Sequence, residues 1–219
     1  MADLVMTDII NGLAALILLM ELLIVASGRL QTLVRAFAIQ SICLGLLAAA
    51  VAYYTGSDHI YFVAGLTIVL KGLIIPRFLT YSMERIHVSK EVEPSVSTPA
   101  SLLIAAALAF LAYYISEPII GTGDLITKNC LPISLAVVLI GLFVMIARKK
   151  AMTEIVGLLS MENGLFLAAI SMTYGMPMIV ELGIFFDILV AVIIMGVFIF
   201  RINRTFESLD TSFLRRLHD

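Results

Sequence analysis

Long uninterrupted apolar runs are the feature that most constrains the fold of this chain. A bilayer core of about 30 Å is crossed by roughly 20 helical residues, and the runs here lack the alternation expected of barrel strands. With 61% hydrophobic residues and a mean hydropathy of +1.08, the composition is typical of an integral membrane protein. We predict an all-α, polytopic fold with seven transmembrane helices at 7–27, 34–54, 59–81, 99–115, 131–147, 151–173 and 177–200.

Basic residues gather in alternate connections between the predicted spans. One side holds Arg29, Arg35, Arg77, Arg85, Lys90, Arg148, Lys149, Lys150, Arg201, Arg204, Arg215 and Arg216, whereas the other side holds only Lys128. Under the positive-inside rule, this pattern predicts an inner-membrane protein with its N-terminus outside and its C-terminus in the cytoplasm. The opening "MADLVMTD" has no basic residue, so we expect the first span to be retained rather than cleaved as a signal peptide.

Four ionisable residues lie near the middle of predicted spans. Lys71 is central in the third span, Glu162 in the sixth and Asp187 in the seventh, and Glu21 lies slightly to the cytoplasmic side of centre in the first. Each would cost roughly 2.5 to 3.5 kcal/mol if it faced lipid at the bilayer centre. We therefore expect these groups to face protein or water and to exchange charge with one another. The alternative is a static buried ion pair that only fixes helix packing.

Two shallower carboxylates extend this set toward the membrane surfaces. Glu154 lies near the cytoplasmic end of the sixth span, and Glu181 lies near the outer end of the seventh. Glu154 and Glu162 differ by about 80° around a helix, so they can address a similar side at different depths. This spacing suits a proton relay. Capping of helix ends, or reaching to water, explains the two end-proximal acids equally well.

Cofactor-binding patterns are missing from the sequence. His59, His87 and His218 lie at a span end, in a loop and in the tail, so no pair is placed to ligate haem within the membrane. Cys43 and Cys130 lie at different depths and predict neither a cluster, a zinc site nor a disulfide. We expect no cofactor in this chain, so any electron carrier would belong to partner subunits.

A weak internal repeat divides the chain into units. A shift of 119 residues places Arg29 on Arg148 and Gly45 on Gly164, and both segments run between the same membrane faces. The tail carries an apolar helical stripe, which would dock on a cytoplasmic partner or lie at the lipid headgroups. The expected units are a three-helix unit with its loop at 1–98, a linking helix at 99–130, a second three-helix unit at 131–202 and an amphipathic cytoplasmic tail at 203–219.

Two segments of the chain resemble known membrane subunits. The sequences "RKKAMTEIVGLLSMENGLFLAA" and "GIFFDILVAVIIMGVFIF" are similar to the K-type subunit of complex I and the C-type subunit of Mrp antiporters. With "LKGLIIPRFL" and the tail "FESLDTSFLRRL", the full layout resembles the component E family of group 4 hydrogenases of the formate hydrogenlyase type. Two departures stand out: Leu159 occupies the position of the family glutamate, with Glu162 three residues later, and the last-helix acid is the shorter Asp187.

The resemblance implies a non-catalytic membrane subunit that relays protons through Glu162 and Asp187, beside antiporter-like membrane subunits. Peripheral-arm hydrogenase subunits would then carry the iron-sulfur clusters and the nickel-iron site. Burial favours protonated carboxyls and a nearby cation favours ionised ones, so we expect Lys71 to tune the acids. The alternatives are a stand-alone or Mrp-type cation/proton antiporter subunit and a structural scaffold whose buried charges set helix register.

Overall fold

The chain is helical throughout the part that the structure describes. This computed structural model describes residues 2–85, 96–120 and 127–173. A short π-helical stretch, η1, joins α3 and α4 into one continuous rod. The helices are α1 (Ala2–Ala26), α2 (Leu30–Thr55), α3 (Asp58–Thr67), η1 (Ile68–Ile74), α4 (Ile75–Arg85), α5 (Thr98–Ile120), α6 (Cys130–Ala147) and α7 (Ala151–Thr173).

Six helices within the described residues are long and apolar enough to cross a membrane. Their bounds agree with the first six predicted spans to within a few residues, which confirms the all-α membrane fold. The two largest differences are at the start of α1, which begins at Ala2 instead of 7, and at the end of α5, which continues through Pro118 to Ile120 instead of ending at 115. The predicted seventh span at 177–200 and the predicted tail at 203–219 lie outside the described residues.

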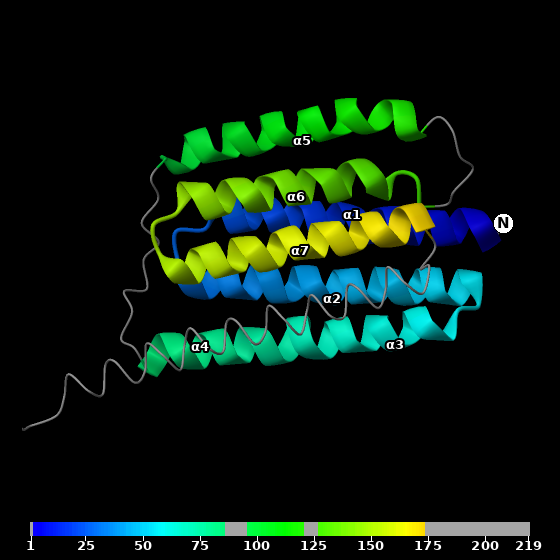
Figure 1. Ribbon diagram of the computed structural model, residues 1–219, viewed down its shortest axis with the longest axis horizontal. Coiled ribbons are helices and arrows are strands. Elements are labelled where there is room, and N and C mark those ends of the chain that lie inside the picture. Colours follow the sequence, from blue (N-terminus) through cyan, green and yellow to red (C-terminus); the bar gives the residue numbers. More distant parts are fainter. Residues whose placement is uncertain (1, 86–95, 121–126, 174–219) are drawn as a thin grey trace, which may run out of the picture.

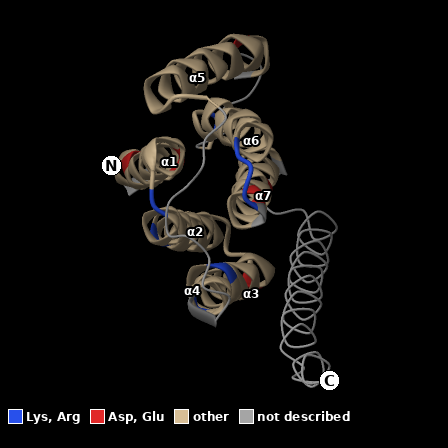
Figure 2. Ribbon diagram, turned by 90° about the vertical axis from the view of Figure 1, so that its left-hand side faces the viewer, with Lys and Arg blue, Asp and Glu red and all other residues tan. Residues whose placement is uncertain are grey.

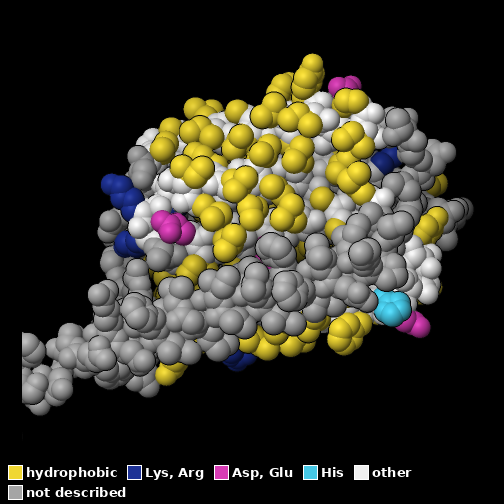
Figure 3. Space-filling model, viewed as in Figure 1, with side chains coloured by type: hydrophobic (Ala, Val, Ile, Leu, Met, Phe, Trp, Pro, Cys, Tyr) yellow, Lys and Arg dark blue, Asp and Glu magenta, His cyan; other side chains and the backbone are white. Residues whose placement is uncertain are grey.

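The helices are arranged around a centre formed by α1, α2, α6 and α7. Within it α1 packs on α2 and α6, and α7 packs on α2 and α6. The α3–η1–α4 rod covers α2 on one side, and α5 covers α6 and α1 on the other (Figure 1). Hydrophobic side chains are spread over the visible surface of the described part (Figure 3), as expected for a surface that faces lipid.

Two apolar clusters fill the inside of this arrangement, one above the other along the helix axes. The first cluster includes Ile24 of α1, Phe37 of α2 and Leu159 of α7. The second includes Ile17, Leu44 and Leu167 of the same three helices. On each of these helices a short polar stretch separates the two clusters. The fold therefore encloses a polar layer between two apolar layers.

The helices alternate in direction, so the α1–α2 and α6–α7 connections lie at the same end of the molecule (Figure 1). These connections carry Arg29, Arg148, Lys149 and Lys150, and Lys and Arg residues are visible at this end in Figure 2. Arg148 is buried, and its Nη2 atom donates a hydrogen bond of 2.6 Å to the carbonyl of Val25 near the end of α1. One basic residue of this end therefore also ties the α6–α7 connection to the end of α1. That this end faces the cytoplasm stays a prediction from the positive-inside rule.

Glycines allow α6 and α7 to approach at backbone distance. A Cβ atom on Gly141 would lie 2.8 Å from the backbone nitrogen of Met161, and one on Gly164 would lie 2.8 Å from the backbone nitrogen of Val138. Small residues are typical of membrane helix interfaces because packing, rather than water exclusion, drives helix association there. The repeat position Gly45 instead faces Ile68 of η1. The predicted repeat itself stays a prediction, since its last span lies beyond Thr173.

We predict that Gly164→Ala destabilises the protein by about 1 to 3 kcal/mol, because the added methyl group meets backbone atoms of α6 that cannot move aside alone. The measurement is thermal unfolding of the purified protein in detergent. Gly12→Ala is the matched control, because nothing lies within 4 Å of a Cβ atom at that position in α1. Equal unfolding temperatures for the two variants would contradict the close approach of α6 and α7.

Candidate functional site

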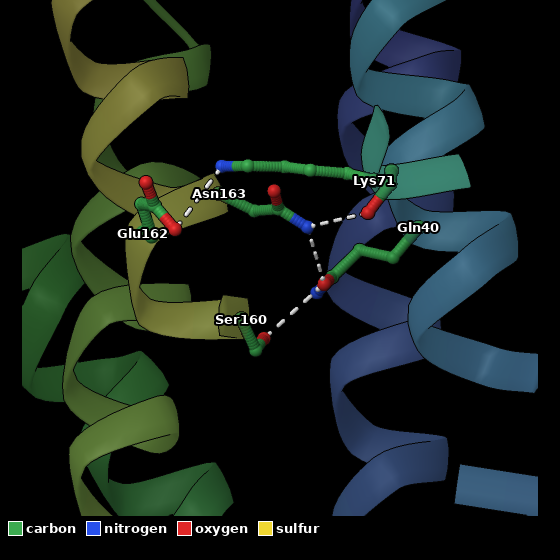
Figure 4. Close-up of polar contacts among 6 residues, drawn as sticks. Gln40, Lys71, Ser160, Glu162 and Asn163 are labelled. Carbon is green, nitrogen blue, oxygen red and sulfur yellow. Dashed lines mark hydrogen bonds and ion pairs between the residues drawn. The ribbon is translucent and has the colours of Figure 1, made fainter. Parts of the chain in front are cut away.

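A cluster of buried polar side chains, the central polar layer, lies between the two apolar clusters. Its members come from α1, α2, η1 and α7, and all of them are buried. Buried polar groups in a membrane protein need partners, because surrounding lipid offers none. Figure 4 shows most of these side chains pointing toward one another across the helix boundaries. The central polar layer consists of Glu21, Gln40, Ser41, Lys71, Ser160, Glu162 and Asn163.

An ion pair between Lys71 and Glu162 is the charged part of this layer. Lys71 Nζ lies 3.4 Å from Glu162 Oε2, and the two side chains are only 1% and 7% exposed. Lys71 extends from η1 toward α7 (Figure 4). Replacing either partner would take away the counter-ion of a buried charge. The structure therefore joins two of the four ionisable residues that the sequence places near mid-span.

Local sequence explains why Lys71 sits on a π-helical stretch. The Ile75 N–H donates to the carbonyl of Leu70, five residues earlier. In a regular α-helix the ring of Pro76 would clash with the carbonyl of Gly72, four residues earlier, and Pro76 would also leave that carbonyl without its usual donor. Wider turns just before the proline relieve this conflict, and such π segments frequently occur at functional sites.

Close packing of η1 on α2 brings Lys71 within reach of α7. A Cβ atom on Gly72 would lie 2.8 Å from Cγ1 of Ile42 in α2, so only glycine permits this approach without a shift. Lysine carries a long flexible stem, and the neighbouring helix α2 itself packs on α7. The glycine after Lys71 thus sets how deeply the ammonium group enters the layer.

Glu21 forms a second acidic position in the layer. Gln40 Nε2 donates a hydrogen bond of 2.7 Å to Glu21 Oε2, and the hydroxyl of Ser160 also donates to that oxygen. The other oxygen, Glu21 Oε1, is buried and accepts no hydrogen bond within the described ranges. Glu21 is therefore held by neutral donors rather than by a cation.

Gln40 connects the two acidic positions through Asn163. Asn163 Nδ2 donates to Gln40 Oε1 at 3.1 Å and to Ser41 Oγ at 3.0 Å. Asn163 directly follows Glu162 on α7. A continuous hydrogen-bonded path thus leads from Glu21 through Gln40 to the residue beside the ion pair. Its amide groups orient neighbouring side chains, whereas the titratable groups are Glu21, Lys71 and Glu162.

The remaining predicted site residues are not brought into this layer. Glu154 is exposed in the first turn of α7, where the helix dipole favours a negative charge, so it does not share the buried surroundings of Glu162. Glu181 and Asp187 lie outside the described residues. Across the described ranges, no group of three or more His, Cys, Asp or Glu side chains could hold a metal ion.

Sequence reasoning missed the neutral members of the layer. Gln40, Ser41 and Ser160 were not identified as site residues, although each stands among apolar residues in the middle part of a predicted span. Hydroxyl groups in membrane helices often satisfy a carbonyl of their own helix, so Ser41 and Ser160 carry little signal alone. Gln40 carries more, because a buried primary amide needs partners from elsewhere.

Comparisons with known proteins find relatives that match nearly the whole chain. No protein-family model matches the chain, and no solved structure matches it significantly. The chain is 36% identical over 208 residues to the uncharacterised protein Rv0085 of Mycobacterium tuberculosis, covering 93% of each chain. It is 27% identical over 213 residues to hydrogenase-4 component E of Escherichia coli, covering 95% of this chain and 97% of that protein.

Hydrogenase-4 component E of Shigella flexneri matches with the same identity and coverage. These matches cover more than nine tenths of the chain, so they concern the whole chain rather than one shared helix hairpin. They confirm the resemblance predicted from the motifs of the third, sixth and seventh spans. The chain therefore belongs to the family of membrane proteins that includes Rv0085 and hydrogenase-4 component E.

Proposed function

We propose that this chain is a proton-translocating membrane-arm subunit of a complex I-related group 4 hydrogenase. Its similarity to hydrogenase-4 component E over nearly the whole chain supports the hydrogenase context. The single observation that carries the proton-relay role is the buried pair of Lys71 and Glu162 in the middle of their spans. Such groups are rare inside membrane segments and mark ion pathways or proton relays.

The chemistry of the pair suits transient proton storage. Burial disfavours a charged carboxylate, whereas a cation 3.4 Å away favours it. Small changes in the position of Lys71 would therefore decide whether Glu162 holds a proton. Carboxylates balanced in this way can take and release protons during a reaction cycle.

Glu21 supplies a second proton-accepting position on the same path. Gln40 and Asn163 hold the two acidic positions in fixed relation, with hydrogen bonds of 2.7 and 3.1 Å. A proton would pass between Glu21 and Glu162 along this polar layer. In the proposed relay, Asp187 continues the path on the predicted seventh span, and Glu154 and Glu181 serve as entry or exit positions.

Electron transfer belongs to partner subunits in this proposal. Antiporter-like membrane subunits would lie beside the chain, and peripheral-arm subunits would hold the iron-sulfur clusters and the nickel-iron site. The described part of this chain offers side chains suited to proton transfer: two buried carboxyls, a buried ammonium group and their hydrogen-bonding neighbours.

We predict that Glu162→Gln lowers enzyme-driven proton uptake into sealed vesicles by roughly tenfold or more, because the amide cannot accept and release a proton. Complex assembly and hydrogenase activity with an artificial acceptor should remain near those of the unchanged complex. Proton uptake is measured with a pH-sensitive dye in vesicles that contain the whole complex.

Two further variants make this measurement specific. Glu117→Gln changes an exposed acid on α5 that lies outside the polar layer, so its proton uptake should be unaffected. Glu162→Asp keeps a titratable carboxyl and should recover part of the lost uptake. Normal proton uptake in the Glu162→Gln complex would refute the relay. Loss of assembly in Glu162→Gln and Glu162→Asp alike would favour the structural scaffold.

Lys71→Met should destabilise the protein by about 3 to 5 kcal/mol, because it leaves the Glu162 carboxylate buried without its cation. The double variant Lys71→Met with Glu162→Gln should recover much of this loss, since no unpaired charge remains. Reversible unfolding in mixed detergent gives the free energy of unfolding for all four members of this cycle. Strictly additive effects of the two changes would show that the pair does not interact.

A further inference from the structure

An open groove lies between α2 and the α3–η1–α4 rod, separate from the central polar layer. Its volume is about 410 Å³, within the range of cavities that hold small ligands. Gly72 and Pro76 form its buried floor, and Leu73 and Tyr81 are exposed along its edge. Most of its lining is apolar, as expected for a surface that contacts lipid chains.

Two arginines give this apolar groove a positive charge. Arg35 of α2 and Arg77 of α4 both line it, and both are exposed. No aspartate or glutamate lines the groove, and neither arginine forms an ion pair within the described residues. Two cations on an apolar surface at a membrane boundary attract an anion, and guanidinium groups bind phosphate oxygens with two parallel hydrogen bonds.

Both arginines lie at the same depth near the basic end of the bundle. Arg35 is five residues from the start of α2, and Arg77 is six residues before Met83, where the third span ends. At 1.5 Å per residue, they lie about 8 and 9 Å inside their helix ends. The groove then runs from Tyr81 to Gly72, about 14 Å along the rod, which is close to half of a bilayer core of about 30 Å.

We propose that this groove binds one anionic phospholipid from the leaflet at the basic end of the bundle. The phosphate lies between Arg35 and Arg77, and an acyl chain follows Leu73 and Pro76 toward Gly72. Basic pockets between membrane helices bind anionic headgroups in this way. The groove is positively charged near the basic end of the bundle, and its apolar part is about as long as one leaflet is thick. This combination matches a phospholipid better than a free phosphate ion. This inference does not depend on the proposed proton relay.

The test uses the purified full-length chain, delipidated in mild detergent and examined by native mass spectrometry. The probes are phosphatidylglycerol and phosphatidylcholine with identical acyl chains. We expect preferential retention of one phosphatidylglycerol. Each cation near a membrane surface contributes about fivefold to affinity, so the double variant R35Q/R77Q should bind phosphatidylglycerol ~25-fold more weakly.

Two controls separate the groove from general surface charge and from misfolding. R29Q removes an exposed charge at the same end but outside the groove, so it should retain phosphatidylglycerol. Ala38→Phe fills the half-buried lining without changing charge, and it should reduce retention of the lipid. Unchanged elution in size exclusion and unchanged circular dichroism verify folding of each variant.

Three outcomes would overturn the proposal. The first is equal binding of phosphatidylglycerol and phosphatidylcholine by the unchanged protein. The second is an effect of R35Q/R77Q no larger than that of R29Q. The third is crosslinking from Tyr81, through a photoreactive residue placed there in the intact complex, to a partner protein and never to lipid.

Discussion

The buried ion pair of Lys71 and Glu162 is the constraint on which the rest of this structure depends. A single charge at that depth would face a large desolvation cost, and both side chains are buried. Their contact at 3.4 Å therefore requires η1 and α7, which both pack on α2, to keep a fixed height relative to each other. The glycines of η1, α6 and α7 permit that arrangement because they let the helices approach closely.

Hydrogen bonds from neutral side chains hold the rest of the central polar layer together. Gln40 uses its amide nitrogen for Glu21 and its amide oxygen for Asn163, so one residue of α2 satisfies groups on two other helices. Apolar clusters on both sides of this layer keep it at one depth, because sliding any helix would move polar groups against aliphatic side chains. Specific pairing here adds to helix packing, which in lipid lacks the strong hydrophobic driving force available in water.

The α3–η1–α4 rod contributes to both proposals, the proton relay and the lipid-binding groove. In the α3–η1–α4 rod, Lys71 points inward to the polar layer, while Arg77 lines the outer groove. Gly72 contributes to both features, because it lies close to Ile42 of α2 and also forms part of the groove floor. Lys71 lies within the π-helical turns before Pro76, and Arg77 directly follows that proline. The groove and the ion pair therefore share one segment of the rod.

The sequence alone determined that the chain crosses a membrane, where its first six spans lie, and that Glu21, Lys71 and Glu162 would be buried. These properties follow from the length of apolar runs and from the cost of charge in lipid, which depend on local sequence. Tertiary structure decided that Lys71 pairs with Glu162, that Glu21 is held by Gln40 and Ser160, and that Glu154 faces outward. Those outcomes depend on how each helix is rotated and how closely it approaches its neighbours. Rotation and approach arise from contacts such as those of Gly72 and Gly164, which join residues far apart in the chain.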